Sequence, residues 1–215
     1  DWHTTPDSLL SGDPNDYIAE SKDFFGEISK YCADNGYDNV LYEICNESTC
    51  GWSNIKSYAE EVMPEITANQ PDAIIIVGTD SWCQKIMEPV SSPIKNEFKK
   101  NVMYSFHYDA CSHYSLLGDF RNAQKHLPVF VSEWSAVHFN GDGPFCKENS
   151  DELISNCDYT SDVAPQVVSW CIWNWSSKNV ASSFFTDYCD PSNLSKYMDE
   201  SGRKYSDYVI DLMNG

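Results

Sequence analysis

Two glutamates that close apolar runs are the residues of this sequence best placed to do chemistry. Glu47 ends a run of strand formers over residues 39–47, and Glu133 lies near the end of a second run over residues 128–134. In barrels and open α/β sheets, the carboxyl ends of the strands are where reactions take place. Cleavage of a glycosidic bond requires two facing carboxyl groups, one to protonate the leaving oxygen and one to attack or stabilise the sugar cation. The alternative is structural, with each glutamate capping a helix or pairing with a surface lysine.

Aromatic and histidine side chains gather at the same predicted strand ends. Indole rings are suitable platforms for the flat C–H faces of sugars. Five tryptophans fall at or just past a strand end, namely Trp2, Trp52, Trp82, Trp134 and Trp173. We interpret Trp170 as a packing residue. His3 and His107 also lie at strand ends. Because two glutamates are predicted at the same edge of the sheet, we expect both histidines to belong to an active site.

Two other kinds of site are disfavoured. The segment 107–113 holds two histidines, an aspartate and a cysteine, but Cys111 and His113 lie beyond the strand end, where alternate residues no longer share a face. We therefore expect neither a metal site nor a cofactor. The serines lack the nucleophile elbow of an esterase triad.

The composition is that of a folded protein with a neutral ligand. Of the 215 residues, 41% are hydrophobic and 14% aromatic, which disfavours disorder. Thirty-three acidic residues against 14 basic ones give a formal charge of −19. Nucleic acids and anionic membranes need a basic surface, so we expect neither as a partner. A sugar polymer is compatible with this charge.

Nine cysteines predict a secreted protein with up to four disulfides. None forms a C-x-x-C pair, which disfavours a zinc ribbon. Cys146 and Cys157 flank a polar loop, and we expect this pair to be bridged. Cys45 and Cys171 lie in strand-like runs and are expected to be buried free thiols.

The elements that must position these residues alternate along the chain. Apolar runs predict five strands, over residues 39–47, 73–78, 102–108, 128–134 and 167–173. Helical spacing predicts helices over residues 16–33, 53–68, 115–126, 151–161 and 205–213. This alternation is typical of βαβ units and a parallel sheet, so we expect one α/β domain over residues 1–215.

The segments around the two glutamates resemble the strand-end motifs of glycoside hydrolase family 5, the cellulase-type retaining β-glycanases. Residues 42–47 (YEICNE) are similar to the motif of the family's strand four, and residues 129–134 (VFVSEW) to that of strand seven. The resemblance implies that Glu47 is the acid/base and Glu133 the nucleophile. It also implies that Asn46 contacts the 2-hydroxyl of the sugar.

Further segments extend the resemblance over nearly the whole chain. They imply that His3 lies in the glycone subsite at the end of strand three, and that His107 lines the site from strand six. Trp173 corresponds to the tryptophan of strand eight that stacks on a sugar, and Lys178 to a subsite lysine. Trp82 corresponds to a tryptophan on the aglycone side.

One position departs from the family pattern. The family carries a tyrosine two residues after the histidine of strand six, where it hydrogen-bonds the nucleophile. Here Asp109 holds that place, and Tyr108 comes one residue early. We expect either a local shift that brings Tyr108 to the site or the loss of this contact.

The resemblance also implies a shortened barrel, because it begins at the end of strand three of an eightfold barrel that typically runs about 250 residues. We expect a partial TIM (β/α) barrel of about five parallel strands and three main helices. Five strands cannot close a small barrel, and native proteins rarely leave sheet edges bare. We therefore expect a homodimer that covers the open edge. The alternative is that the chain is a fragment of a longer polypeptide.

Together these features predict a secreted, retaining endo-β-1,4-glucanase that hydrolyses cellulose or related β-glucans by double displacement. Two alternatives stay open. The substrate can instead be mannan, xylan or mixed-linkage glucan. The chain can also be a non-catalytic glycan-binding remnant, whose aromatic residues bind sugar while its two acids are not held in register.

Overall fold

The computed structural model describes residues 1–3, 12–158, 167–185 and 204–214. They group into two compact units. The first contains residues 1–106 and 119–130, and the second contains residues 107–118, 131–158 and 167–214, so far as they are described. The prediction of a single catalytic domain over residues 1–215 stays a prediction.

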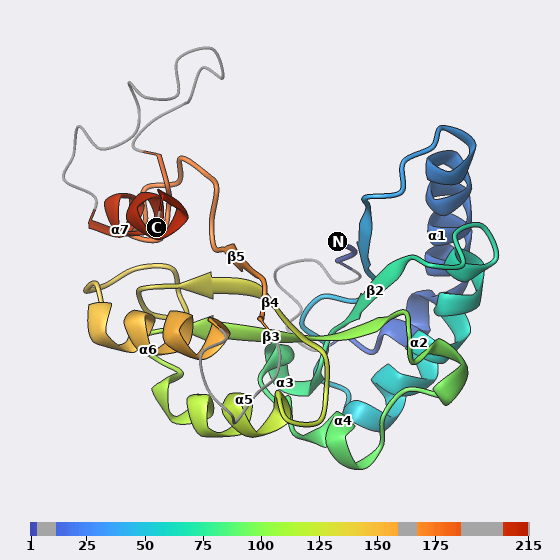
Figure 1. The fold of residues 1–215 in the computed structure, drawn as a ribbon, viewed down its shortest axis with the longest axis horizontal. Coiled ribbons are helices and arrows are strands. Elements are labelled where there is room, and N and C mark those ends of the chain that lie inside the picture. Colours follow the sequence, from blue (N-terminus) through green and yellow to red (C-terminus); the bar gives the residue numbers. More distant parts are fainter. Residues whose placement is uncertain (4–11, 159–166, 186–203, 215) are drawn as a thin grey trace. The chain divides into compact units, whose positions relative to one another are not determined.

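Five strands follow one another in the sheet in the order of the sequence (Figure 1). They are β1 (Leu41–Glu43), β2 (Ile74–Val77), β3 (Val102–Asp109), β4 (Val129–Ser135) and β5 (Trp170–Ile172). β1 pairs in parallel with β2, β2 with β3, and β4 with β5. The prediction of five parallel strands is confirmed. β1 is shorter than the apolar run suggested, although Ile44 just after it still donates to the carbonyl of Ile76 on β2.

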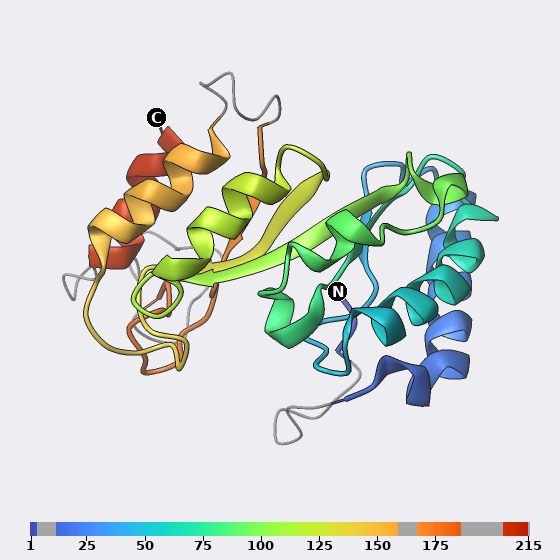
Figure 2. The ribbon, with the colours of Figure 1, turned by 90° about the horizontal axis from the view of Figure 1, so that it is seen from below.

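Two long helices, α1 (Ile18–Asp34) and α2 (Trp52–Thr67), pack side by side in the first unit (Figures 1 and 2). A 3-10 turn, η1 (Pro14–Tyr17), leads into α1 and is capped by the side chain of Asp13. The apolar spacing of α2 buries one face completely, with Ile55, Tyr58, Ala59, Val62, Met63 and Ile66 at 0% exposure. Shorter elements follow β2, namely α3 (Asp80–Cys83), α4 (Glu88–Ser91) and η2 (Asn96–Phe98).

The remaining helices are η3 (Tyr114–Leu116), α5 (Leu117–Ala123), α6 (Lys147–Cys157) and α7 (Lys204–Asn214). In the second unit, α6 and α7 lie side by side (Figure 2), and the hydroxyl of Tyr208 donates to Asp151 across them at 2.8 Å. The described chain holds five helices of seven residues or more, and three of them, α2, α5 and α6, connect consecutive strands as crossover helices. No helix of the described residues is long and apolar enough to span a bilayer.

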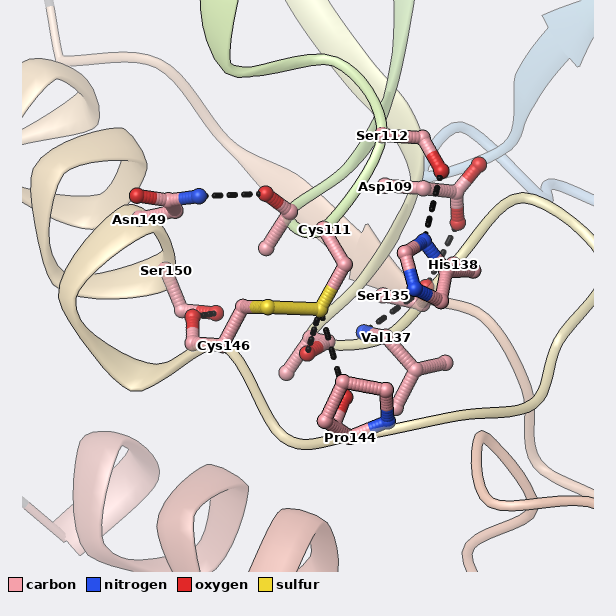
Figure 3. Close-up of a disulfide and its surroundings, with 12 residues drawn as sticks. Asp109, Cys111, Ser112, Ser135, Val137, His138, Pro144, Cys146, Asn149 and Ser150 are labelled. Atoms are coloured by element: carbon pink, nitrogen blue, oxygen red, sulfur yellow. Dashed lines mark hydrogen bonds between the residues drawn. A yellow bond between two sulfur atoms is a disulfide. The ribbon is translucent and has the colours of Figure 1, made fainter.

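The disulfide of the second unit joins Cys111 and Cys146, with a Cα–Cα distance of 5.5 Å (Figure 3). The predicted Cys146–Cys157 bridge is therefore wrong. Cys146 caps the start of α6 and Cys157 ends it, so a helical rise of about 1.5 Å per residue separates the two by about 16 Å. That distance is well beyond the reach of a disulfide.

The free thiols of the described chain include Cys32, Cys45, Cys50, Cys83 and Cys157. The described residues contain one disulfide where up to four were expected, and Cys189 lies outside them. The prediction of a buried thiol is confirmed for Cys45 and wrong for Cys171, which is exposed because β5 is the last strand of the sheet.

Candidate active site

Glu47 lies in the turn that follows β1, in the first unit. The backbone N–H of Asn46 donates to the carbonyl of Trp2 at 3.0 Å, so the segment 1–3 lies beside the chain just before Glu47. From α2, the hydroxyl of Tyr58 donates to the carbonyl of Ile44 at 2.7 Å. Glu47 itself has a φ of 46°, in the left-handed region that non-glycine residues seldom adopt. Contacts on both sides thus hold this carboxylate on a strained backbone.

His3 and Asn46 meet at the same turn. The side-chain amide of Asn46 is 3.2 Å from Nδ1 of His3, and Nε2 of His3 is 2.5 Å from Oδ2 of Asp1. The amide N–H donates to Nδ1, so Nε2 carries the proton that bonds Asp1. Oδ1 of Asn46 is buried and has no hydrogen-bond partner among the described residues. A buried carbonyl oxygen without a partner is costly, which indicates that a ligand donor completes this site.

Trp82 lies in the turn after β2, with 39% of its surface exposed. Three consecutive residues have left-handed backbones, with φ values of 54° at Ser81 and 58° at both Trp82 and Cys83. The carboxylate of Asp80 accepts a hydrogen bond from the backbone N–H of Gly51 at 2.7 Å. This bond ties the turn that presents Trp82 to the segment that follows Glu47.

Gly78 allows β2 to approach the chain after β1. A Cβ at this position would lie 2.4 Å from the carbonyl oxygen of Cys45, which no real Cβ contact allows. The glycine is therefore required by the close approach of two backbones directly behind Asn46 and Glu47.

Glu133 and His107 meet in the second unit, from β4 and β3. Nδ1 of His107 lies 3.8 Å from Oε2 of Glu133, and Nε2 lies 2.9 Å from the hydroxyl of Ser132. His107 is 4% exposed, and the side chain of Glu133 is 18% exposed. The imidazole is thus fixed by packing and by Ser132, and it restrains a largely buried carboxylate.

Tyr108 and Asp109 point to opposite faces of β3, as successive strand residues do. The hydroxyl of Tyr108 donates to the carbonyl of Asn149 on α6 at 3.2 Å. The carboxylate of Asp109 accepts a bond of 2.5 Å from the hydroxyl of Ser135 (Figure 3). β3 runs without a break through Asp109, so it contains no local shift that would turn Tyr108 to the face of His107. The first of the two expectations for Tyr108 is therefore wrong.

Trp173 and Lys178 lie on the segment that follows β5. The backbone N–H of Trp173 donates to the carbonyl of Trp134 at 2.7 Å, which places Trp173 beside the strand that carries Glu133. Its indole is 38% exposed, and Lys178 is exposed.

Two of the five tryptophans that were expected to bind sugar, Trp134 and Trp52, are buried packing residues instead. Trp134 is 0% exposed and meets the rings of Trp170, Tyr205 and Tyr208 edge to face. Trp52 is 7% exposed, and its indole N–H donates to the carbonyl of Ser92. For these two residues a neighbouring element covers the ring, which the position at a strand end did not reveal. Trp2 packs on Phe24 at 4.7 Å between ring centroids but is only half-buried.

The family model for cellulases, glycosyl hydrolase family 5, matches residues 1–179. The chain belongs to this family. The match covers every predicted site residue, from His3 to Lys178.

Members of the cellulase family from bacteria are similar to the chain. Endoglucanase A of Butyrivibrio fibrisolvens is 36% identical over 223 residues, a match that covers 100% of this chain and 47% of that protein. Endoglucanase E-5 of Thermobifida fusca is 37% identical over 182 residues, covering 82% of this chain and 36% of that protein. The chain thus spans less than half the length of these relatives.

Solved family 5 structures confirm the fold. The catalytic domain of Thermobifida fusca endoglucanase Cel5A superposes with a TM-score of 0.81 at 32% identity, covering all of this chain and 68% of that one. A variant of the same enzyme in complex with cellotetraose gives a TM-score of 0.82 at 31% identity, again covering all of this chain and 68% of that one. The five parallel strands therefore form a partial TIM barrel of the family 5 type, as predicted.

The structure adds two residues that sequence reasoning missed in this family 5 chain. Asp1 holds Nε2 of His3, and Ser132 holds Nε2 of His107. Asp1 was detectable, because residues two apart on an extended segment share a face. Ser132 carried no such signal, since its contact depends on the register of β4 against β3.

Proposed function

We propose that the chain carries the catalytic acids of an endo-β-1,4-glucanase that hydrolyses cellulose or related β-glucans with retention of configuration. The observation that carries the proposal is the family 5 match over residues 1–179, with one carboxylate in the turn after β1 and another on β4. Parallel strands present their carboxyl ends at one edge of a sheet, where the site of a barrel enzyme lies.

In this proposal Glu133 attacks the anomeric carbon while Glu47 protonates the leaving oxygen. Glu47 then removes a proton from the water that releases the sugar, and the two displacements retain the configuration. His107, at 3.8 Å from Glu133, acts as a positioning residue. Its second nitrogen is occupied by Ser132, which limits rotation of the ring.

Asn46 and His3 would bind the sugar beside Glu47. The unpaired Oδ1 of Asn46 accepts a hydroxyl proton, which suits contact with a sugar 2-hydroxyl. Trp82 and Trp173 present partly exposed indoles as stacking platforms, and Lys178 contributes a hydrogen-bond donor. The cellotetraose complex of a similar enzyme supports a β-glucan oligosaccharide as the ligand.

The test is hydrolysis of carboxymethyl-cellulose by Glu47→Gln and Glu133→Gln variants. We expect each change to lower the rate at least about a hundredfold, because each removes an acid that acts in the transition state. Glu61→Gln, at an exposed position of α2, is the matched control and should leave the rate unchanged. Activity near that of the wild type in both site variants would refute the assignment.

Two further assays separate the alternatives. Proton NMR of the first product released from cellopentaose gives the anomeric configuration, and an inverted product would contradict double displacement. Binding of cellopentaose without any product would favour a glycan-binding remnant. Higher kcat/KM for mannan, xylan or mixed-linkage glucan than for cellulose would reassign the substrate.

We also propose secretion and self-association. The Cys111–Cys146 disulfide favours an oxidising compartment. β5 pairs with β4 and is the last strand of the sheet among the described residues, and an edge strand is a natural place for a second copy to bind. Sedimentation velocity should show a dimer, and a folded monomer at all concentrations would remove this part of the proposal.

A further inference from the structure

A second exposed tryptophan follows β5 and has no role in the site described above. Trp175 lies two residues after Trp173, in the second unit, and its indole is 57% exposed. The indole of Trp175 is thus more exposed than that of Trp173, which is 38% exposed. An exposed indole that its neighbours hold in place can present a flat apolar face to a ligand.

Two buried phenylalanines hold this indole. The ring of Trp175 stacks on Phe184 at 4.6 Å between centroids and 26° between planes, and it meets Phe185 edge to face at 4.7 Å. Phe184 and Phe185 are 1% and 2% exposed. Phe184 therefore covers one face of the indole and leaves the other to solvent.

The backbone of the segment is braced by its own hydrogen bonds. The N–H of Asn174 donates to the carbonyl of Ser182 at 3.0 Å, and the N–H of Phe184 donates to the carbonyl of Asn174 at 3.1 Å. The N–H of Phe185 donates to the carbonyl of Ser176 at 3.0 Å. Because the ring is already fixed, a ligand that stacks on it has little conformational entropy to remove.

The surroundings of the indole favour a neutral ligand rich in hydroxyl groups. Residues 173–185 contain no acidic residue, in a chain with a formal charge of −19, and their exposed polar side chains are those of Ser177, Lys178 and Asn179. Hydroxyl, ammonium and amide groups on the same segment as an aromatic face can bond sugar hydroxyls while the ring stacks on sugar C–H groups.

We propose that Trp175 is a further stacking platform for a β-glucan chain, beyond Trp173 on the same segment. The identity of the ligand rests on the proposed function. Trp173 lies beside the strand that carries Glu133, through its hydrogen bond to Trp134, and Trp175 is the next exposed tryptophan on the same segment. Its contribution is to the binding of longer oligosaccharides, because a short one is held by the residues nearest the acids.

The experiment measures binding by calorimetry in the Glu133→Gln background, with cellohexaose and cellotriose as ligands. Trp175→Leu keeps apolar contact with Phe184 but removes the planar face. We expect it to weaken cellohexaose binding about tenfold and to leave cellotriose binding unchanged. Trp175→Tyr keeps a ring and should weaken binding by no more than about threefold.

Tyr31→Ala is the matched control, since Tyr31 on α1 is also 57% exposed, and this variant should bind both ligands unchanged.

A thermal melt of each variant first establishes that it folds as the background protein does. Equal cellohexaose affinity for Trp175→Leu and the background would then overturn the inference. A dimer that dissociates in Trp175→Leu, with unchanged sugar affinity, would also overturn it and assign the indole to contact between copies. The proposed function is tested separately by hydrolysis with the wild-type chain. Loss of cellohexaose affinity in Trp175→Leu supports the platform even where that chain proves inactive.

Discussion

Asn46 and Glu47 are the residues at which the demands of folding and of function diverge most. Glu47 has a left-handed backbone, and Asn46 keeps a buried carbonyl oxygen without a partner among the described residues. Both features cost stability, and both belong to residues to which we assign contact with substrate. Such local costs are characteristic of functional sites, where the surrounding fold enforces a geometry that binds a ligand.

Asn46→Ala should separate stability from function. The variant loses a hydrogen bond to His3 but also removes the unpaired oxygen, so we expect the free energy of unfolding to change by less than about 1 kcal/mol. Hydrolysis of carboxymethyl-cellulose should fall about tenfold to a hundredfold, since a sugar contact is lost. Urea denaturation and initial rates measure the two quantities.

Asn101→Ala is the control for this change. The side-chain amide of Asn101 is buried and donates to the carbonyls of Pro71 and Ala73 at 3.0 and 2.8 Å. Its removal should lower the free energy of unfolding by about 1–3 kcal/mol. A larger loss of stability in Asn46→Ala than in Asn101→Ala would contradict the role given to Asn46.

At the scale of elements, the contact between β2 and the turn after β1 requires a residue without a side chain at position 78, which is Gly78. Gly78→Ala would place a Cβ against the backbone carbonyl of Cys45, and a backbone atom cannot rotate away as a side chain can. We expect a loss of about 1–3 kcal/mol in the free energy of unfolding, together with reduced activity, because the same turn carries Glu47.

Gly118→Ala in α5 is the matched control, since a Cβ there meets nothing within 4 Å. Alanine is the better helix former, so this variant should be unchanged or more stable by up to about 1 kcal/mol. Chemical denaturation of both variants checks the pair, and equal stabilities would show that the turn after β1 can move aside.

The contact of α6 with α7 should depend on pH through Asp151. Hydrogen bonds from Lys147 and Tyr208 lower the pKa of this carboxyl from its usual value. A pKa that is lower in the folded chain than in the unfolded one stabilises the fold above the unfolded pKa of about 3.9 and loses that effect as the pH falls through the folded pKa. Asp151→Asn should therefore cost up to about 1 kcal/mol at neutral pH and progressively less below about pH 4.

Asp72 offers the comparison for this prediction. Its carboxylate pairs with Lys100 at 2.6 Å, and this pair lowers the pKa of Asp72, but the side chain is 92% exposed. Solvent screens such a pair, so Asp72→Asn should have no measurable effect on stability at any pH. Denaturation of both variants at several pH values is the measurement, and a pH-independent cost of Asp151→Asn would contradict the assignment.

For the whole molecule, the Cys111–Cys146 disulfide is the strongest single constraint on the loops that follow β3 and β4. It closes a loop with a sequence separation of 35. On the chain-entropy account, such a loop contributes about 3–4 kcal/mol to the free energy of unfolding. A Cys111→Ser, Cys146→Ser double variant should lose about this amount in denaturation experiments, and so should the wild type under reducing conditions.

Cys171→Ser is the control, because Cys171 is exposed and takes no part in the Cys111–Cys146 disulfide. It should unfold as the wild type does under both oxidising and reducing conditions. Identical stability of the oxidised and reduced wild type would show that the bridge constrains nothing.

The sequence alone was enough to predict the five strands in chain order and the five helices that precede, connect and follow them, and to single out Glu47 and Glu133 as candidate acids. These features depend on periodicity and turn residues within a few positions, so they can be recognised locally. The Asn-Glu and Ser-Glu-Trp motifs likewise identified the family, because each motif is contiguous in the chain.

Only the tertiary structure decided the features that depend on which distant elements meet. It paired Cys146 with Cys111 rather than with Cys157. Cys157 is closer to Cys146 in sequence, but helix α6 separates the two in space. It buried Trp134 and left Trp175 exposed, although both lie near strand ends. Burial and pairing are set by the neighbours that packing brings together, and no local pattern encodes those neighbours.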